Sequence, residues 1–272
     1  MSGTVLTTGA NSGLGLATVI EVARRGYRSV GSVRSEDKAR EVVDTAADAG
    51  VTVETVLLDV TDADRCAAVI AEVGPLYGLV NNAGFGGLGA IEDVGDDEAR
   101  LMFETMVLAP ARLARLALPG MRAAGAGRIV NMSSIFGRAT LPLVGWYQGC
   151  KHALEALTDA LRTEVAADGI GVTLIEPGGF KTGIWDDVSG DVTDRQGSRY
   201  DAAYARSMDW IRRASPFMGD PGRVAGVVGR ALDSRNPPPR TLVGYDAQVA
   251  SLLDRITLTS VKDRVTRTFL GL

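Results

Sequence analysis

The sequence predicts an α/β fold in which one doubly wound, parallel β-sheet carries helices on both faces. Short, largely apolar and β-branched runs alternate with amphipathic stretches from the first residues onward. Continuous apolar runs are typical of parallel strands, because helices cover both faces of such a sheet. The expected strands are residues 5–8, 27–33, 53–58, 79–81, 129–132, 172–175 and 241–244.

Helical stretches fill the intervals between these runs, and their ends carry recognisable signals. Gly26, Gly125 and Gly169 each follow a helical pattern and are expected to end a helix, because glycine readily takes the left-handed conformation found there. Thr61, followed three residues later by Asp64, resembles a capping box. We therefore expect Thr61 to begin the helix after the third strand.

The segment at residues 182–215 interrupts the alternation. It loses strand character and interleaves glycines and aromatic side chains with charges, which favours an insertion with some helix at about residues 183–216. A helix at residues 223–232 and the last strand then complete the pattern. Since no linker or repeat divides the chain, we expect one domain over residues 1–272.

Composition narrows the class of function. Lys and Arg number 29 and Asp and Glu 33, so the net charge is -4, and no general attraction to nucleic acid or to an anionic membrane is expected. The first residues lack the basic and apolar regions of a secretory signal, and no run of about 18 apolar residues occurs. We expect a cytoplasmic protein that binds neither nucleic acid nor membranes.

Histidine and cysteine are scarce. The chain has one histidine, His152, and two cysteines, Cys66 and Cys150, which form no metal-ligand spacing. A zinc site with several histidine ligands is therefore impossible, and we expect no metal. If the chain is an enzyme, side chains other than histidine are expected to move its protons.

A glycine-rich turn follows the first expected strand and leads directly into a helix. Glycines at such a turn permit positive φ and let the backbone approach a pyrophosphate, which then lies at the positive end of the helix. The turn therefore predicts a dinucleotide site in a Rossmann-type fold. Its candidate cofactor-binding residues are Gly9, Asn11, Ser12, Gly13, Leu14 and Gly15.

On these residues the chain resembles the short-chain dehydrogenase/reductase family. Residues 8–15 match that family's TGxxxGxG turn, residues 81–84 match its NNAG motif, and a serine lies 13 residues before a YxxxK motif. The resemblance implies that Ser134, Tyr147 and Lys151 are catalytic. It further implies cofactor contacts from Tyr147, Lys151, Asp59, Val60, Asn82, Ala83, Gly84, Pro177, Gly178 and Thr182.

Tyr147 and Lys151 are four residues apart in the helical stretch at residues 147–167, so they share one face of the helix. A phenol with a pKa of about 10 is a poor base near neutrality, but a neighbouring ammonium favours the phenolate. We therefore expect Lys151 to lower the pKa of Tyr147. Tyr147 then exchanges a proton with the substrate oxygen, and Ser134 holds that oxygen while nicotinamide exchanges a hydride.

The end of the second expected strand indicates which nicotinamide cofactor is used. NAD-binding proteins usually carry an acidic residue there, whereas this chain has Val33 followed by Arg34. A guanidinium attracts a 2′-phosphate and can hold it through two hydrogen bonds. We therefore predict NADP(H), bound by Arg34 with Ser32 or Ser35. In the alternative, Arg34 is a solvated charge and Glu36 or Asp37 binds the ribose.

One position departs from the family pattern. Met106 stands where the family usually has a catalytic asparagine, whose main-chain carbonyl helps to hold a water in a proton relay. Methionine retains that carbonyl, so we expect activity. The alternatives are a catalytically weak NADP-binding regulatory protein, and a dehydratase or epimerase of the same fold.

The apolar side chains near the expected nicotinamide site favour a lipophilic ketone or secondary alcohol, such as a steroid, polyketide or acyl compound. The loop at residues 85–89 and the insertion are expected to flank the nicotinamide, and the insertion contributes Trp185, Tyr200, Tyr204, Met208, Trp210 and Phe217. In the alternative these residues only pack the insertion, and Arg206, Arg212 and Arg213 form a solvated face. The resemblance is greatest to hydroxysteroid-dehydrogenase-like members, and it implies a homodimer or homotetramer.

Overall fold

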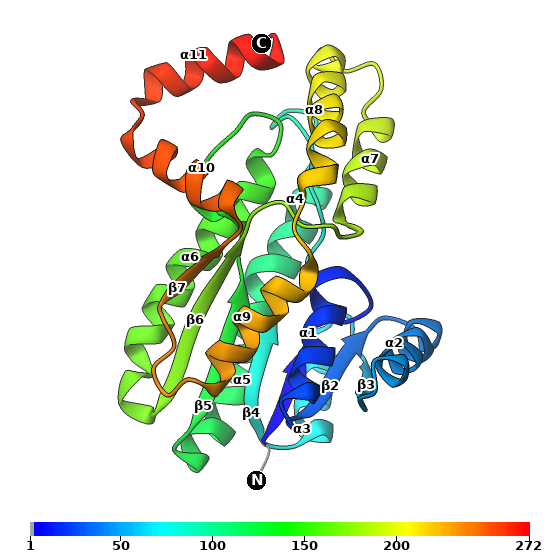
Figure 1. The fold of residues 1–272 in the computed structure, drawn as a ribbon, viewed down its shortest axis with the longest axis vertical. Coiled ribbons are helices and arrows are strands. Elements are labelled where there is room, and N and C mark those ends of the chain that lie inside the picture. The colour runs from blue at the N-terminus through cyan, green and yellow to red at the C-terminus, as the bar shows by residue number, and fades with distance from the viewer. Residues whose placement is uncertain (1–2) are drawn as a thin grey trace.

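The computed structural model describes residues 3–272, apart from the side chains of residues 186 and 187. Its seven strands form one parallel sheet in the order β3-β2-β1-β4-β5-β6-β7 (Figure 1). The strands are β1 (Thr4–Thr7), β2 (Arg28–Val33), β3 (Glu54–Leu57), β4 (Leu76–Asn81), β5 (Gly127–Met132), β6 (Ile170–Pro177) and β7 (Arg240–Val243). The predicted α/β fold class is confirmed.

Helices cover both faces of the sheet, as expected for a doubly wound fold. One face carries α1 (Gly13–Arg24), α2 (Glu36–Asp48) and α9 (Pro221–Asp233), and the other carries α3 (Ala63–Val73), α5 (Ala109–Ala124) and α6 (Gly145–Glu164). Apolar side chains of these helices pack on the buried strands, and each fully buried Val or Leu contributes about 1.5–3 kcal/mol. The core thus lies in two layers, one on each side of the sheet.

The strand order reverses between β1 and β4, which lie side by side although two strands separate them in sequence. In an open parallel sheet, the connections that follow these two strands diverge and leave a crevice at their carboxyl ends. The glycine-rich turn follows β1 and the segment at residues 82–84 follows β4. The fold therefore brings the two motifs to one point at the carboxyl edge.

Helix ends agree only in part with the sequence signals. Gly26, Gly125 and Gly169 have φ of 81°, 61° and 73°, as expected for glycines that end helices. The expected capping box at Thr61 is wrong, because the Asp62 carboxylate accepts from the Arg65 N–H at 2.9 Å and caps α3. Thr61 instead donates to Asp59.

The remaining long helices are α4 (Asp96–Phe103), α7 (Ile184–Asp194), α8 (Asp201–Ala214), α10 (Tyr245–Ile256) and α11 (Thr259–Leu270). Four of them, α7, α8, α10 and α11, lie beyond the carboxyl ends of the strands (Figure 1). Short turns of other helix types are η1 (Glu104–Leu108), η2 (Ile135–Gly137), η3 (Ala166–Asp168) and η4 (Ser215–Phe217). Within residues 3–272, no helix combines the length and the apolar character needed to cross a membrane.

A buried polar chain ties the middle of the sheet to α6. The Asn81 amide donates to the Asn131 side-chain oxygen at 2.8 Å, and the Asn131 amide donates to the Thr158 hydroxyl at 2.8 Å. All three residues are at most 4% exposed. Because a buried polar group without a partner costs about 1–3 kcal/mol, this chain fixes β4, β5 and α6 relative to one another.

Replacing Asn131 with alanine is expected to lower the free energy of unfolding by about 2–4 kcal/mol, because it removes two buried side-chain hydrogen bonds and leaves a small cavity. Urea unfolding of wild type and Asn131→Ala measures this loss. The control is Thr45→Ala, which removes an exposed hydroxyl bonded to a carbonyl of its own helix and should change stability by at most about 0.5 kcal/mol. Equal effects from the two variants would contradict the role of the chain.

Candidate active site at the carboxyl edge

The glycine-rich turn after β1 is packed too closely to accept side chains. A Cβ on Gly15 would lie 2.0 Å from the Gly9 carbonyl oxygen, and a Cβ on Gly9 would lie 2.9 Å from the Ala83 Cα. Gly9 and Gly13 also have positive φ, 65° and 51°, which glycine adopts without strain. The packing and the backbone conformation of this turn therefore require glycine at these positions.

Thr8 and Asn82 hold this turn against the segment after β4. The Thr8 hydroxyl accepts from the backbone N–H groups of Asn82 and Ala83 at 3.0 and 2.9 Å. The Asn82 side-chain amide donates to the Thr8 and Gly9 carbonyls at 2.9 and 3.1 Å. Thr8, which lies in the TGxxxGxG match, is missing from the residues predicted to form the site, although its hydroxyl organises this junction.

The amino end of α1 fits an anionic group. Ser12 precedes the helix with extended backbone and makes no side-chain capping bond, and the first turn of α1 has no acidic residue. No acidic side chain of the first turn therefore compensates the unpaired N–H groups and the positive end of the helix dipole. Thr182 lies beside this turn, since a Cβ on Gly13 would be 3.0 Å from its side chain. A dinucleotide pyrophosphate suits this arrangement.

Two residues predicted to bind cofactor have side chains that pack in the core. Val60 is 7% exposed and packs with α3 and α5, while Leu14 packs against the layer around α9. Asp59, in contrast, is exposed, and its carboxylate accepts from the Thr61 N–H and hydroxyl at 2.9 and 2.7 Å. These hydrogen bonds, aided by the charge of Arg34, lower the pKa of Asp59.

Ser134, Tyr147 and Lys151 converge where β5 ends and α6 begins. Ser134 follows β5, and its hydroxyl accepts from the Phe136 N–H at 3.2 Å. The Lys151 ammonium donates to the Met132 carbonyl at 2.9 Å and lies 5.6 Å from the centre of the Tyr147 ring. The Phe136 ring stands edge-on to Tyr147, with centroids 6.3 Å apart. The three predicted catalytic side chains therefore lie close together at the junction of β5 and α6.

The pKa of Tyr147 differs from the value that the sequence led us to expect. Burial raises the pKa of Tyr147 to about 12, and a hydrogen bond with Ser134 opposes the rise. Burial also lowers the pKa of Lys151 to about 8. The expected lowering of the Tyr147 pKa is therefore wrong for this structure, because loss of water outweighs the one opposing contribution, the hydrogen bond with Ser134. At pH 7 the phenol is protonated and able to donate.

Arg34 is exposed beyond β2 and, among the described residues, forms no ion pair within 4 Å. Of the two acidic alternatives, Asp37 pairs with Arg40. Ser35 caps α2 by accepting from the Lys38 N–H at 3.4 Å. The hydroxyl of Ser32 is buried and has no hydrogen-bond partner in the described part of the chain.

The stretch that contains Pro177 and Gly178 is tied to the start of α10. The Asp246 carboxylate accepts from the Gly179 N–H at 2.5 Å, and the Gly178 N–H donates to the Val243 carbonyl at 2.9 Å. Sequence reasoning missed Asp246, because no pattern connects a residue after β7 with a loop after β6.

Met106 lies in η1, a single turn of π-helix between α4 and α5. Its side chain is 1% exposed, and a Cβ on Gly84 would lie 3.5 Å from it. Pro110 stands four residues later and has no N–H, so the Met106 carbonyl lacks the donor that an α-helix would supply. The main-chain carbonyl at this position is thus retained without an α-helical donor, and the Met106–Pro110 spacing in the sequence already indicates this.

The insertion packs differently from the expectation that its aromatic residues flank the substrate. Tyr204 is 1% exposed and its hydroxyl bonds Asp93 and the Ala90 N–H, while Tyr200 bonds Glu92. Trp185 donates to the Phe180 carbonyl, and Arg206 donates to the Leu270 carbonyl at the end of α11. Most of these side chains therefore anchor α7, α8 and α11.

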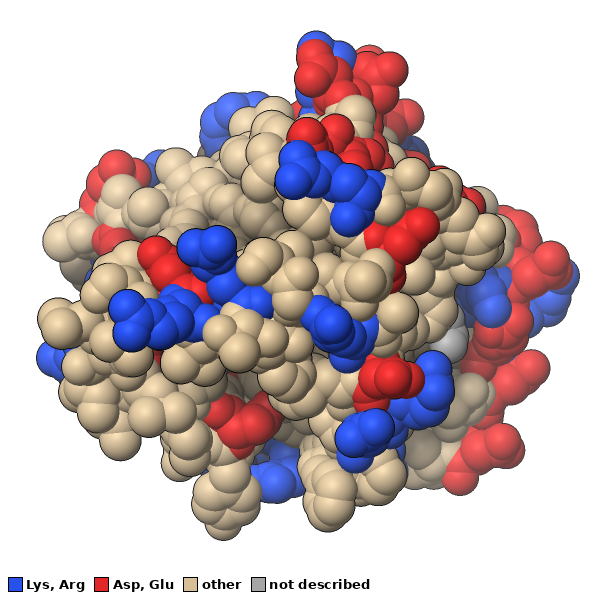
Figure 2. All heavy atoms as spheres, turned by 90° about the horizontal axis from the view of Figure 1, so that it is seen from above, with Lys and Arg blue, Asp and Glu red and all other residues tan. Residues whose placement is uncertain are grey.

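Apart from Trp210 and Phe217, which are 54% and 89% exposed, a larger set of exposed apolar side chains comes from α10, α11 and the link between them. They are 47–76% exposed and comprise Tyr245, Val249, Leu252, Leu253, Ile256, Leu258, Val261, Val265 and Phe269. Figure 2 looks onto this end of the molecule and shows uncharged surface broken by scattered charges. Sequence reasoning missed both helices.

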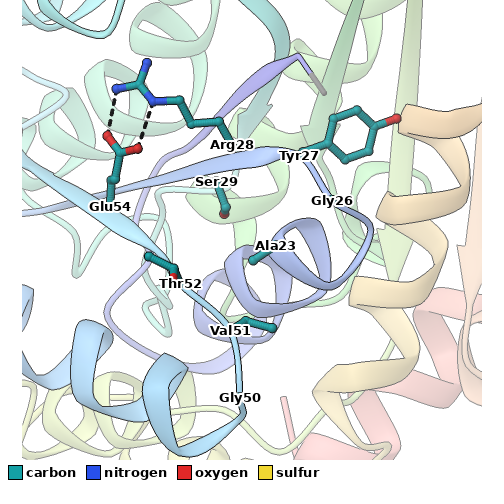
Figure 3. A pocket seen from close by; sticks show the side chains of 9 residues that line it. All are labelled: Ala23, Gly26, Tyr27, Arg28, Ser29, Gly50, Val51, Thr52 and Glu54. Carbon is teal, nitrogen blue, oxygen red and sulfur yellow. Dashed lines mark hydrogen bonds and ion pairs between the residues drawn. The ribbon is translucent and has the colours of Figure 1, made fainter. Parts of the chain in front are cut away.

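A separate hollow of about 420 Å³ lies between the ends of α1 and α2 and the starts of β2 and β3 (Figure 3). Its lining includes the Arg28–Glu54 ion pair, with two contacts of 2.7 and 2.8 Å. Since ligands of open α/β sheets bind at the carboxyl ends of the strands, this hollow lies at the wrong end for catalysis.

Comparison with known proteins agrees with this geometry. A family model described as short chain dehydrogenase matches residues 3–193. The oxidoreductase YusZ of Bacillus subtilis is 33% identical over 82% of this chain and 82% of its own. The 3-ketodihydrosphingosine reductase of Bacteroides thetaiotaomicron is 31% identical over 90% and 89%. Retinol dehydrogenase 7 of Rattus norvegicus is 32% identical over 90% and 81%.

Solved structures show the same fold. A short-chain dehydrogenase from Streptomyces avermitilis has a TM-score of 0.79 and 32% identity, covering 98% of this chain and 95% of its own. A variant actinorhodin polyketide ketoreductase with NADPH has a TM-score of 0.80 and 27% identity, covering 92% and 97%. The chain belongs to the short-chain dehydrogenase family and is an oxidoreductase of that family.

A methyl group at position 15 should disrupt the turn, because it collides with the Gly9 carbonyl. We expect Gly15→Ala to raise the Kd for NADPH by at least about 100-fold, which corresponds to roughly 2.7 kcal/mol. Fluorescence titration of NADPH measures the Kd. The control is Gly190→Ala in α7, where a Cβ meets nothing within 4 Å. Unchanged affinity in Gly15→Ala would contradict the assignment of this turn to the cofactor.

Proposed function

We propose that the protein is an NADP(H)-dependent reductase of a lipophilic ketone, or in the reverse direction a dehydrogenase of the corresponding secondary alcohol. The observation that carries the proposal is the convergence of the Ser134 hydroxyl, the partly buried Tyr147 phenol and the Lys151 ammonium at the end of β5. These groups lie at the same edge of the sheet as the glycine-rich turn, so one extended cofactor reaches both.

The chain's own residues supply the proton chemistry. Tyr147 donates its phenolic proton to the carbonyl oxygen, and the Ser134 hydroxyl donates a hydrogen bond to the same oxygen as negative charge develops. When bound, nicotinamide supplies the hydride to the carbonyl carbon. The high pKa of Tyr147 keeps the proton in place at neutral pH, and Lys151 places a positive charge near the phenolate that remains.

Arg34 supports a preference for NADP(H). Its guanidinium is exposed next to the end of β2, and the buried hydroxyl of Ser32 lies two residues before it. A 2′-phosphate would give Arg34 a bidentate, charge-assisted partner. Structures similar to this chain include one with NADPH, which supports the same choice.

The exposed apolar residues of α10 and α11 support a lipophilic substrate. On α10 they recur at positions 245, 249, 252 and 256, which form one stripe along the helix. Contiguous exposed apolar surface commonly marks a binding site. Similar proteins are named for retinol, ketodihydrosphingosine and a polyketide as their substrates, and all of these are lipophilic.

Tyr147→Phe is expected to reduce kcat for NADPH oxidation with lipophilic ketones by at least about 100-fold, because the proton donor is lost. The Kd for NADPH should stay within about threefold, since the ring remains. A panel of long-chain, steroid and retinoid carbonyls tests the wild type at the same time. Tyr27→Phe, whose hydroxyl bonds Asp233 on the surface, serves as the control. Full activity in Tyr147→Phe would overturn the mechanism.

Arg34→Ala is expected to shift the ratio of kcat/KM for NADPH over NADH by about 10- to 100-fold toward NADH, because the 2′-phosphate loses its charged partner. Steady-state kinetics with both cofactors measures the ratio. Arg40→Ala removes another exposed arginine, on α2, and should leave the ratio unchanged. The same ratio in Arg34→Ala and wild type would favour Glu36 or Asp37 as the ribose contact.

A further inference from the structure

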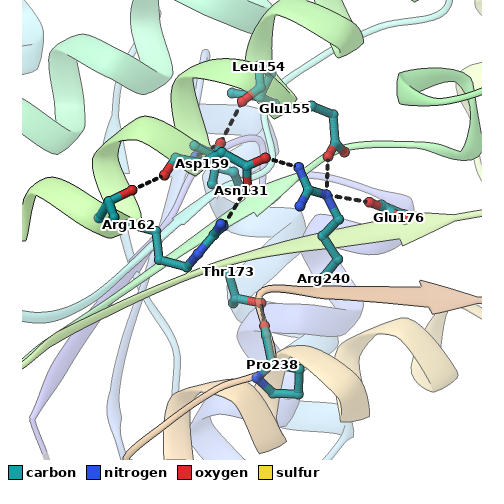
Figure 4. Close-up of polar contacts among 11 residues, drawn as sticks. Asn131, Leu154, Glu155, Asp159, Arg162, Thr173, Glu176, Pro238 and Arg240 are labelled. Carbon is teal, nitrogen blue, oxygen red and sulfur yellow. Dashed lines mark hydrogen bonds and ion pairs between the residues drawn. The ribbon is translucent and has the colours of Figure 1, made fainter. Parts of the chain in front are cut away.

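Glu176 is a fully buried carboxylate at the end of β6, directly before Pro177 and Gly178. It lies between two guanidinium groups. The Arg138 Nε is 2.7 Å from one carboxylate oxygen, and the Arg240 Nε is 3.5 Å from the other. Figure 4 shows Glu176 beside Arg240. The mechanism described above does not use any of these three groups.

Arg240 connects Glu176 to α6. Its guanidinium donates to Glu155 at 2.9 Å and also bonds Asp159, and both acids lie on α6 (Figure 4). Glu155 lies four residues after Lys151 and therefore on the same face of the helix. Its negative charge raises the pKa of Lys151, against the larger lowering by burial. The cluster thus reaches the helix that carries Tyr147 and Lys151.

Arg138 connects Glu176 to the turn that carries Ser134. This turn is η2, which Ser134 begins and which Arg138 follows. The Arg138 backbone N–H donates to the Ile135 carbonyl at 3.0 Å, so the side chain of Arg138 extends from backbone that belongs to the turn. A Cβ on Gly137 would lie 3.1 Å from a Glu155 oxygen, so the turn also rests on α6.

Burial of Glu176 is costly in the ionised form. Desolvation, and after it repulsion from Glu155, raise the pKa of Glu176 from 4.5 to about 7, while Arg138 opposes the rise. Because the folded chain binds this proton more tightly than the unfolded chain, the stabilising contribution is largest below pH 4.5 and is lost as the pH rises through about 7. A neutral side chain would therefore serve stability at least as well at high pH.

We propose that Glu176 is a positioning residue for the reaction. By holding Arg138 and Arg240 it fixes the Ser134 turn relative to the helix that carries Lys151. The charged groups that face it are Arg138 from the turn, Arg240 from β7 and Glu155 from α6. Protonation of Glu176 weakens both ion pairs, so the geometry should loosen as the pH falls below about 7. This inference rests on the proposed catalytic role of Ser134 and Lys151.

The test compares Glu176→Gln with wild type in kcat and in KM for NADPH across pH. We expect kcat of the wild type to fall by about 10- to 100-fold below neutral pH, the size of effect that small misplacements of catalytic groups produce. Glu176→Gln should show the low kcat at every pH, so that its kcat no longer falls as the pH decreases. Its KM for NADPH should stay within about threefold, and its Tm at pH 8 should not fall. The proposal would be overturned if kcat of Glu176→Gln fell at low pH as in wild type, or if the variant kept full kcat.

Two further variants isolate the interaction. Arg138→Met removes the partner on the turn and should give the same loss, and the double variant with Glu176→Gln should be no worse than either single one. The matched control is Glu54→Gln, which breaks the exposed Arg28 ion pair at the far edge of the sheet and should leave kcat unchanged. Additive losses in the double variant would show that the two residues act separately and contradict the proposal.

Hydrogen–deuterium exchange of residues 133–139 tests the inference without any substrate. After correction for intrinsic exchange rates, exchange at pH 8 should be about 10-fold faster in Glu176→Gln than in wild type if the turn loosens. In wild type, the corrected rate should rise about 10-fold when the pH is lowered from 8 to 6. If wild type reduces no carbonyl, the proposed function fails while this readout still decides the role of Glu176. If Glu176→Gln does not fold, Arg138→Met carries both measurements. Unchanged exchange would overturn the proposal.

Discussion

The backbone geometry of the candidate active site depends on the hydrogen bonds of the Thr8 hydroxyl. It accepts two backbone N–H groups from the segment after β4, while Asn82 donates back to two carbonyls of the turn after β1. These bonds hold the connection after β1 against the connection after β4, although the strand order directs the two connections away from each other. The close packing that results excludes side chains at Gly9 and Gly15.

The protonation states of Tyr147 and Lys151 depend on burial as much as on neighbouring charges. Tyr147 and Lys151 are on one face of α6, yet burial raises the pKa of the tyrosine and lowers that of the lysine. The site therefore holds a neutral phenol ready to donate, which suits reduction of a carbonyl. The bond from Lys151 to the Met132 carbonyl ties the ammonium to the end of β5, next to the turn with Ser134.

Local patterns in the sequence predicted most of the sheet and much of the site. Apolar runs located all seven strands to within a few residues, and the glycine turn and the YxxxK spacing placed their residues together. Interactions between distant segments could not be predicted in this way. The Glu176 ion pairs with Arg138 and Arg240, and the Asp246 bond to Gly179, join residues with no regular spacing.

Two local signals were misleading or overlooked. Asp62 rather than Thr61 caps α3, because Asp59 engages the threonine hydroxyl and leaves the next carboxylate free to cap. The helices α10 and α11 follow the last strand, where the repeating alternation ends, so that pattern gave no reason to expect them. Their apolar stripes are the main support for a lipophilic substrate.

The most direct test of the central junction compares two adjacent threonines. Thr8→Val removes the acceptor of two N–H groups, whereas Thr7→Val removes a buried hydroxyl that has no hydrogen-bond partner within residues 3–272. Fluorescence titration should show the Kd for NADPH rising by at least about 10-fold in Thr8→Val, from one unsatisfied N–H alone, and staying unchanged in Thr7→Val. Equal affinities in the two variants would contradict the account.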